Sequence, residues 1–171
     1  MCDVVDPTVD RIMNREVATV SPATMLQEAV RRMNELRIGC LVVESQGEPV
    51  GIVTERDILR LVENGRSPAD LAVKMIMTSP VEVIGLDQSI EDASSLMLKL
   101  RIRRLPVVKD GKLIGIITST DILRAAKEGM FAREVFIYLS DIFKDGKLRP
   151  SNNLSPPEES RKVVPPRPDT S

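Results

Sequence analysis

The chain has 171 residues, of which 42% are hydrophobic and 29% charged, and its formal net charge is −1. This composition is typical of a globular protein with one domain, or with two small units that share a core. The balanced charge argues against nucleic acid as a partner. No apolar run approaches the roughly 20 residues of a membrane span, and the N-terminus lacks the pattern of a secretory signal. We therefore expect a cytoplasmic protein without membrane association.

Several kinds of catalytic and metal chemistry are missing from the chain. There is no histidine, which is the usual general base and the commonest metal ligand. The two cysteines, Cys2 and Cys40, do not have the spacing of a disulfide framework or a zinc site. There is also no glycine-rich phosphate loop. We expect no enzymatic activity, no metal site and no resident cofactor.

The sequence contains an internal repeat. A shift of 64 residues aligns 12–65 with 76–129 without a gap, and 19 of the 54 aligned pairs are identical. The strongest match is between "GIVTERDILRLVENG" at 51–65 and "GIITSTDILRAAKEG" at 115–129. Such self-similarity indicates two copies of one structural unit.

The first half of copy one predicts a short strand followed by a helix. Residues 17–20 are the strand candidate. Thr24 is a candidate N-cap, with Gln27 at capping-box spacing. Apolar residues then recur at the spacing of one helix face, namely at Leu26, Ala29, Val30, Met33 and Leu36.

The second half of copy one predicts two strands and a closing helix. The strands are 40–44 and 49–54, separated by turn residues. The helix is 55–64, and Gly65 is placed to end it as the C′ residue. Each copy is therefore expected to have the order β-α-β-β-α.

Copy two repeats the pattern. Its first helix has its apolar face at Ile90, Ala93, Met97 and Leu100. The stretch 108–118 has an Asp-Gly pair between two strands, which is a strong hairpin signal. One copy of about 60 residues buries too little surface to be stable alone. We expect the copies to pack through their sheets with pseudo-twofold symmetry, in the α/β (α+β) fold class.

The expected organisation has six parts. Ser67 and Pro68 are placed as N-cap and first residue of a short helix in the linker. Residues 130–143 contain every aromatic residue of the chain on two apolar helical stripes, so this helix either caps its own core or contacts a second chain. The last stretch is rich in proline and predicts a disordered tail. The parts are an N-terminal segment 1–8, repeat 9–65, linker 66–73, repeat 74–129, helix 130–143 and tail 144–171.

The repeated phrases resemble a known family. "GIVTERDILR" and "GIITSTDILR", preceded by "RIGCLVV" and "RIRRLPVV", are similar to a tandem pair of cystathionine-β-synthase (CBS) domains, also called a Bateman module. The resemblance covers 9–129. It implies a regulatory sensor that binds adenine nucleotides or S-adenosylmethionine between the repeats and commonly forms a homodimer. It also implies an effector enzyme or transporter as partner, which the sequence does not identify.

The Thr-x-x-Asp of each phrase has two interpretations. As a capping box, Asp57 or Asp121 accepts a hydrogen bond from the N-cap residue, Thr54 or Thr118. As a nucleotide site, the carboxylate accepts from the ribose hydroxyls, and the threonine and the helix N-terminus face ligand oxygens. Capping boxes favour Glu or Gln over Asp at this position, which, with the resemblance, favours the nucleotide site.

The resemblance implies two clefts, each lined from both copies. The cleft of Asp121 is expected to include Thr118, Ile116, Arg104, Ile38, Val17 and Ala18. The cleft of Asp57 is expected to include Thr54, Ile52, Cys40, Ile102, Val81 and Glu82. For Ile38 and Ile102, simple core packing is the alternative interpretation.

Basic residues distinguish the copies. Copy two has "RIRRLP" where copy one has "RIGCLV", and a guanidinium can bind two phosphate oxygens at once. Arg103 or Arg104 is therefore the expected phosphate contact, although a solvated basic turn is the alternative. We expect the Asp121 cleft to bind the more anionic ligand, or to bind more tightly. The competing function is a ligand-independent dimerisation or interaction protein that uses the 130–143 helix.

Overall fold

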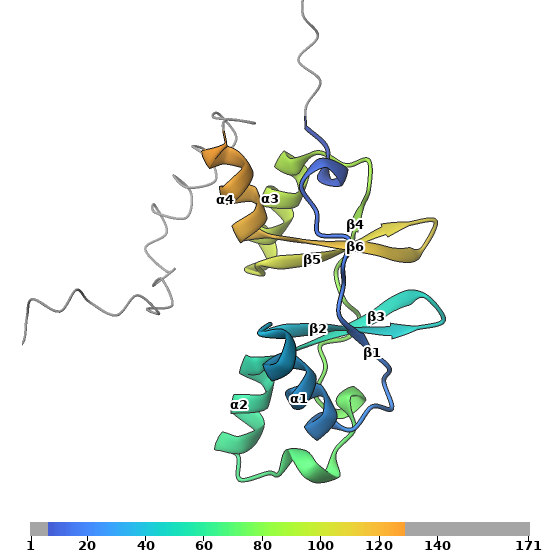
Figure 1. The fold of residues 1–171 in the computed structure, drawn as a ribbon, viewed down its shortest axis with the longest axis vertical. Coiled ribbons are helices and arrows are strands. Elements are labelled where there is room, and N and C mark those ends of the chain that lie inside the picture. The colour runs from blue at the N-terminus through green and yellow to red at the C-terminus, as the bar shows by residue number, and fades with distance from the viewer. Residues whose placement is uncertain (1–6, 129–171) are drawn as a thin grey trace, which may run out of the picture.

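The computed structural model describes residues 7–128 (Figure 1). The first half contains a short strand, a helix, a hairpin and a second helix, as copy one predicts. A 3-10 helix (η) precedes them and two more follow them. These elements are η1 (Val9–Arg11), β1 (Thr19–Val20), α1 (Leu26–Leu36), β2 (Cys40–Ser45), β3 (Glu48–Thr54), α2 (Glu55–Glu63), η2 (Pro68–Asp70) and η3 (Val73–Met75).

The second half repeats this order, so the predicted mixed α+β fold of two β-α-β-β-α repeats is confirmed. Its elements are β4 (Ile84–Gly85), α3 (Ile90–Leu100), β5 (Arg104–Lys109), β6 (Lys112–Thr118) and α4 (Ser119–Lys127). The predicted aromatic helix, 130–143, and the predicted tail, 144–171, lie outside the described residues. None of the helices within 7–128 has the length and hydropathy needed to cross a membrane.

Each repeat forms a three-stranded sheet in which a parallel strand pairs with an antiparallel hairpin. The orders are β1-β2-β3 and β4-β5-β6. The two hairpins share one register: Cys40 pairs with Thr54, and Arg104 pairs with Thr118 at the positions 64 residues later. Both hairpins have a register shift at the same place, after Val43 and Val107. This agreement extends the sequence repeat to the level of single backbone pairs.

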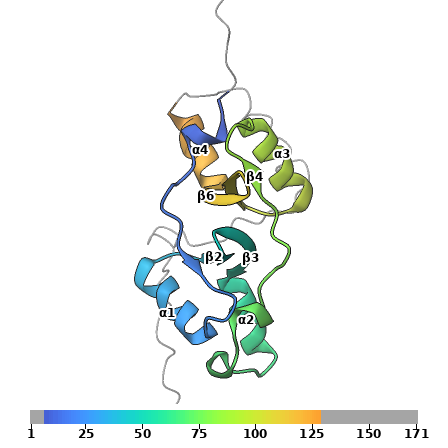
Figure 2. The ribbon, with the colours of Figure 1, turned by 90° about the vertical axis from the view of Figure 1, so that its right-hand side faces the viewer.

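The two sheets face each other, and the helices lie on the outer sides (Figures 1 and 2). The hairpin tips lie side by side. There, the amide of Leu113 donates to the carbonyl of Gly47 at 2.8 Å, and Lys112 Nζ lies 3.2 Å from Glu48 Oε1. Positions 48 and 112 are equivalent in the repeat, so their meeting is what the predicted pseudo-twofold symmetry requires.

The first turn of each sequence copy packs into the core of the other repeat. Val9 and Met13 are buried in the second core, and Val73 is buried in the first. The backbone of Asn14 pairs with Ile116 of β6, with hydrogen bonds of 2.9 Å in both directions. In Figure 1, η1 accordingly lies beside α3 of the second repeat before the chain runs to β1. The sequence repeat and the spatial unit therefore have different boundaries.

The segment that begins each copy and packs on the other repeat is called here the exchanged segment. Each exchanged segment crosses a sheet at a glycine. A Cβ on Gly115 would lie 2.6 Å from Met13 Sδ and 3.1 Å from the carbonyl oxygen of Asn14. A Cβ on Gly51 would lie 2.7 Å from Met77 Sδ. A Cβ at either position would force the methionine to move and would press on a backbone carbonyl oxygen, so the glycine that opens both phrases has a steric cause.

The turn and cap predictions are mostly confirmed. Gly65 follows α2 with φ of 72°, and the hydroxyl of Ser67 accepts from the amide of Ala69 at the start of η2. Asp110 and Gly111 form the second hairpin turn with φ of 50° and 76°. The cap predicted at Thr24 is wrong: α1 begins after Met25, because the Thr24 hydroxyl instead accepts from the amide of Ser21 within the preceding turn.

The segment exchange generates a stability prediction. Val9→Ala removes buried methyl groups from the second core, so it should lower the free energy of unfolding by about 2 kcal/mol. Native-state hydrogen exchange should show the loss of protection in β4–β6, although Val9 belongs to copy one in sequence. Val73→Ala should show its loss in β1–β3.

Met75→Ala serves as the control, because this neighbour of Val73 in η3 is 59% exposed and should leave protection unchanged. If Val9→Ala instead lowered the protection of β1–β3, the packing of the Val9 segment into the second core would be contradicted.

Candidate ligand-binding site

The site is built on the turn between β6 and α4. The amide and the hydroxyl of Thr118 both donate to Asp121 Oδ2, at 2.9 and 2.6 Å, and the Asp121 amide lies 3.3 Å from the Thr118 hydroxyl oxygen. This is a capping box, and it fixes the carboxylate over the first turn of the helix. The side chain of Asp121 is 13% exposed, so the rest of the carboxylate is largely shielded from solvent.

The turn between β3 and α2 has the same geometry. The amide and the hydroxyl of Thr54 donate to Asp57 Oδ2, again at 2.9 and 2.6 Å. Both carboxylates therefore act in capping, so the preference of capping boxes for Glu or Gln does not argue against a capping role here. The shorter side chain is sufficient because the threonine hydroxyl also donates to it.

Capping occupies one oxygen of each carboxylate. Among the described residues, the nearest group recorded for Asp121 Oδ1 is Nη1 of Arg124, at 3.6 Å. A carboxylate oxygen offers two acceptor positions, so Oδ1 can still accept from another donor. The capping and ligand interpretations are therefore compatible at Asp121.

A cavity of about 800 Å³ lies beside Asp121, between the two repeats. The second repeat contributes the end of β6, the start of α4 and the start of β5. The first repeat contributes the segment before β1 and the end of α1. The predicted residues that line this cavity are Asp121, Thr118, Ile116, Arg104, Ile38, Val17 and Ala18. The structure thus brings together all the residues predicted for the Asp121 cleft.

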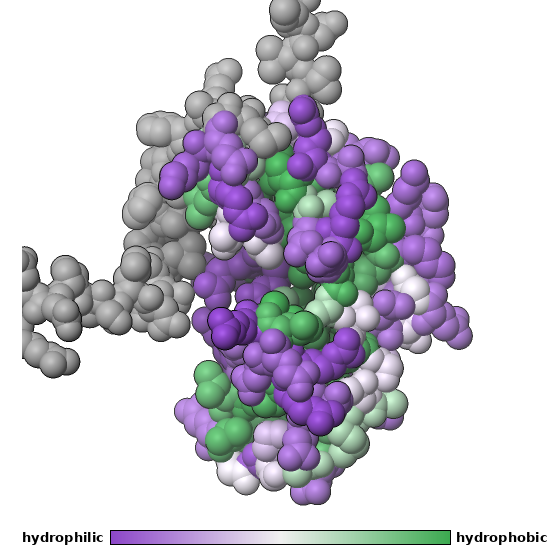
Figure 3. Space-filling view, in the orientation of Figure 1, coloured by the Kyte–Doolittle hydropathy of each residue, from purple (hydrophilic) through white to green (hydrophobic). Residues whose placement is uncertain are grey.

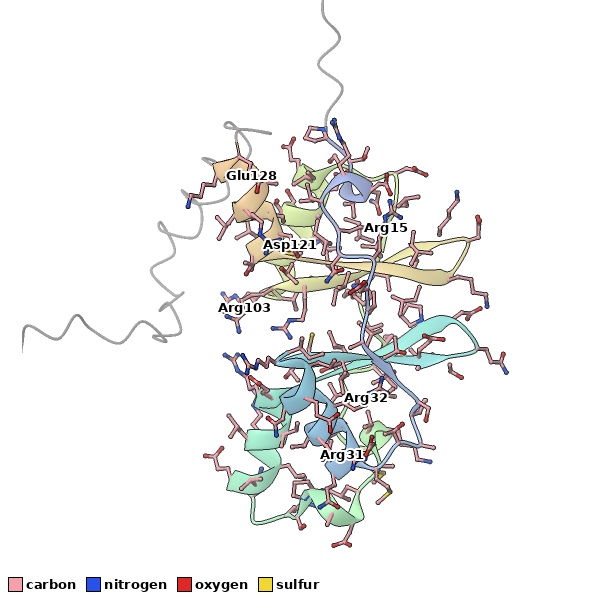
Figure 4. The ribbon with its side chains drawn as sticks, viewed as in Figure 1. Arg15, Arg31, Arg32, Arg103, Asp121 and Glu128 are labelled. Carbon is pink, nitrogen blue, oxygen red and sulfur yellow. The ribbon has the colours of Figure 1, made fainter. Side chains whose placement is uncertain are left out.

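The two predicted phosphate contacts differ in position. Arg104 is half-buried, and its Nη1 donates to the carbonyl of Gly39 in the other repeat at 3.2 Å. Arg103 is exposed and is not part of the cavity lining. Figure 4 shows Arg103 at the edge of the second repeat and Asp121 at the start of α4. Arg104 is the first residue of β5, whereas Arg103 precedes the strand, and only Arg104 lines the cavity.

Several lining residues were missed in the sequence. They are Asn14, Glu16, Leu36, Arg37, Gly39, Val42, Thr120 and Arg124. Arg124 could have been found, because it lies one helical turn after Asp121. Asn14 and Glu16 depend on the segment exchange, for which the sequence contains no signal. Leu36 belongs to the predicted apolar face of α1 yet is 53% exposed, because it lies at the cavity wall rather than in the core.

The residues predicted for the Asp57 cleft do not line one cavity. The cavity beside Asp57 measures about 280 Å³ and is lined by Asp57, Arg60, Leu61, Asn64, Arg66 and Ile76. The other predicted members, which lie outside this lining, are Thr54, Ile52, Cys40, Ile102, Val81 and Glu82. Almost all of the lining comes from one repeat, so this cavity is not an inter-repeat cleft.

Three residues predicted for the Asp57 cleft lie elsewhere in the structure. Cys40 lines the Asp121 cavity, because the first residues of β2 and β5 lie opposite each other near the pseudo-twofold axis. Ile102 packs against the second core, as the alternative interpretation proposed. The backbone of Ile52 pairs with Thr78, at 2.9 and 3.1 Å.

The surface around the Asp121 cavity is mixed in character. Figure 3 shows hydrophilic residues around the space between the repeats on this face, with hydrophobic residues between them. Among the lining residues, Val17, Ile38 and Ile116 are half-buried aliphatic side chains. A cavity of this size, with apolar walls and a few polar groups, fits a small organic ligand.

Comparison with known proteins identifies the repeats. The model of the CBS domain matches residues 9–64 and 73–128. An uncharacterised protein of Methanopyrus kandleri, MK0525, is 41% identical over 120 residues, which are 68% of this chain. The chain spans 61% of the length of that relative.

Two similar solved structures are complexes with adenosyl compounds. CBSX2 in complex with AMP is 31% identical, with a TM-score of 0.65 over 73% of this chain and 99% of that one. The CBS domain pair of MJ0100, in complex with 5-methylthioadenosine and S-adenosyl-L-methionine, is 26% identical, with a TM-score of 0.67 over the same shares. With both copies matched by the domain model and the fold shared, this chain belongs to the CBS-domain family as a tandem pair.

Proposed function

We propose that the chain is a regulatory module that senses an adenine nucleotide or another adenosyl compound in the Asp121 cavity. The observation that carries this proposal is the position of Asp121. Its Oδ2 is fixed by the capping box, and its Oδ1 remains able to accept from a ligand in a cavity between two repeats. A ligand that contacts both repeats binds one arrangement of them better than another, which is the physical requirement for a switch.

The lining residues suggest how the ligand is held. The ribose hydroxyls donate to Asp121, and the adenine packs between the aliphatic side chains of Ile38, Ile116 and Val17. Similar structures with AMP and with S-adenosylmethionine support an adenosyl ligand. With no histidine in the chain, a binding role is favoured over an enzymatic one.

Oligomerisation, the effector partner and a cytoplasmic location stay predictions. Exposed apolar side chains on the outer helices support a homodimer: α2 exposes Leu59 by 68% and Val62 by 53%, and α4 exposes Leu123 by 39%. Apolar side chains gathered on outer helices are typical of interaction sites. The ligand-independent alternative, through 130–143, concerns residues outside the described part of the chain.

A thermal shift screen separates ligand sensing from the ligand-independent alternative. A ligand at 100 times its dissociation constant should stabilise the fold by about 2.7 kcal/mol through mass action. We expect AMP, ATP or S-adenosylmethionine to raise the melting temperature. If none of these compounds, nor NAD, changed the melting temperature from that of the protein alone, the ligand-independent interaction protein would be favoured.

The two aspartates provide a matched pair of variants. Asp121→Ala should lower the affinity for AMP by about tenfold or more, because a hydrogen bond to a charged group contributes about 1.5–3 kcal/mol. Asp57→Ala should leave most of the affinity in place. Calorimetry measures both, and an equal loss in the two variants would contradict the assignment to the Asp121 cavity. Each variant loses one capping box, so the effects on folding are matched.

Asp121→Asn separates capping from ligand binding. The amide oxygen can replace Oδ2 as the acceptor of the cap, but the remaining amide group donates where the ribose hydroxyls also donate. This variant should unfold closer to the wild-type temperature than Asp121→Ala, while binding AMP as weakly. AMP affinity equal to the wild type would show that the carboxylate does not hold the ribose.

A further inference from the structure

The tips of the two hairpins meet through one charged side chain. The first tip, 45–49, connects β2 to β3, and the second tip, 109–113, connects β5 to β6. Lys112 of the second tip donates from Nζ to the carbonyl of Gln46 in the first, at 2.8 Å. The same Nζ lies 3.2 Å from Glu48 Oε1. Lys112 thus contacts two groups of the opposite tip.

The remaining tip contact is made by the backbone, and it forms in one direction only. The amide of Leu113 donates to the carbonyl of Gly47 at 2.8 Å. The position equivalent to Leu113 in the first tip is Pro49, which has no N–H to return the bond. A Cβ on Gly47 would lie 3.1 Å from Lys112 Cδ, whereas a Cβ on the equivalent Gly111 would have no such neighbour within 4 Å. The second tip therefore supplies every donor, and Lys112 makes two of the three bonds.

The tips and the Asp121 cavity lie at opposite ends of the hairpins. Figure 1 shows the tips on one side of the molecule and the helices α2 and α4 on the other. β2 begins at Cys40, in the cavity wall, and ends at the first tip, about 17 Å away at the rise of a strand. At the cavity end, within 7–128, one hydrogen bond joins the start of β5 to the residue before β2, from Arg104 to Gly39. The repeats are therefore joined by more bonds at the tips than at the cavity.

A hairpin that is fixed at its tip can move mainly at its other end. At a distance of about 17 Å, a rotation of about 10° around the tips moves the start of a strand by about 3 Å. A ligand that contacts Asp121 on one side and Ile38 on the other would close this end. If the tips were free to separate, the ligand would also have to fix their spacing. That ordering would cost conformational entropy on binding.

We propose that Lys112 is a positioning residue for the Asp121 cavity: it keeps the hairpin tips together as a fixed pivot while the cavity end opens and closes around its ligand. This inference rests on the proposed function and states how the ligand changes the arrangement of the repeats. Lys112 does not line the cavity. Its ion pair is exposed, by 53% at Lys112 and 59% at Glu48, so it adds little to the stability of the fold. Removing Lys112 should loosen the tips without unfolding the protein.

Amide hydrogen exchange of the full chain tests the tip contact. The Leu113 amide is bonded to the first tip, so its exchange reports separation of the tips. The Ile116 amide, on the same strand, is bonded to Asn14 and reports the packing of the exchanged segment. Lys112→Ala should accelerate exchange at Leu113 by about tenfold and leave Ile116 unchanged.

Lys109→Ala provides the matched control. Lys109 is paired with Lys112 in the register of β5 and β6, and it is also exposed. Within residues 7–128 its side chain makes no hydrogen bond or ion pair. This variant should leave the exchange at Leu113 and the affinity for AMP as in the wild type. If it had the same effects as Lys112→Ala, the loss of a charge would explain them, and the contacts of Lys112 would not.

Calorimetry with AMP tests the link between the tips and the cavity. Lys112→Ala should bind AMP about threefold to tenfold more weakly at a nearly unchanged melting temperature, because the ligand must then also order the tips. In the wild type, AMP should slow exchange at Leu113 and Ile116 by the same factor. A fixed pivot is closed with and without ligand, so only the general stabilisation by mass action is expected there.

The outcomes distinguish this inference from the proposed function. If Lys112→Ala bound AMP as tightly as the wild type, or accelerated Leu113 and Ile116 equally, Lys112 would have no positioning role. If AMP slowed Leu113 more than Ile116 in the wild type, the tips would separate in the free protein and would not be a fixed pivot. If the wild type bound none of AMP, ATP and S-adenosylmethionine, the proposed function would fail, and the positioning role would fail with it.

Discussion

The structure depends on the exchange of the first turn of each repeat with the other repeat. Met13 crosses β6 over Gly115, and Asn14 pairs with Ile116, so the chain is attached to the second sheet before it enters the first. The segment 14–18 must then cross the gap between the sheets, where it becomes one wall of the Asp121 cavity. The same packing that makes each core complete therefore also creates the site.

The capping box orients Asp121 and leaves its second carboxylate oxygen able to accept a hydrogen bond. Two donors from Thr118 converge on one carboxylate oxygen and hold the side chain in a single orientation. A ligand that binds the other oxygen does not need to order this side chain, so less conformational entropy is lost on binding. Asp57 has the same cap but lies beside a smaller cavity. A capping box alone therefore does not make a ligand site. Whether a ligand can bind depends on the cavity around the carboxylate oxygen that the cap leaves free.

Much of this architecture could be predicted from the sequence, because local patterns determine it. The Asp110–Gly111 turn sets the hairpin register, and the gapless repeat transfers that register to Cys40 and Thr54. The exchange could not be predicted, since a repeat shows which segments are equivalent but not which copy each one packs against. Arg37 was missed as a lining residue for a related reason: the cavity lies between segments that are distant in the chain.

At the Asp121 cavity, side chains break the pseudo-twofold symmetry of the repeats. Gly39, Cys40 and Ala18 line the Asp121 cavity, and Arg103, Arg104 and Glu82 occupy the equivalent positions of copy two. Small residues on one side of the axis leave space, and Arg104 from the opposite side extends into that space to reach Gly39. Of the two equivalent positions 40 and 104, the small Cys40 thus leaves space in the Asp121 cavity and Arg104 adds positive charge to it. A duplicated fold can in this way acquire two unequal sites without any change in its backbone register.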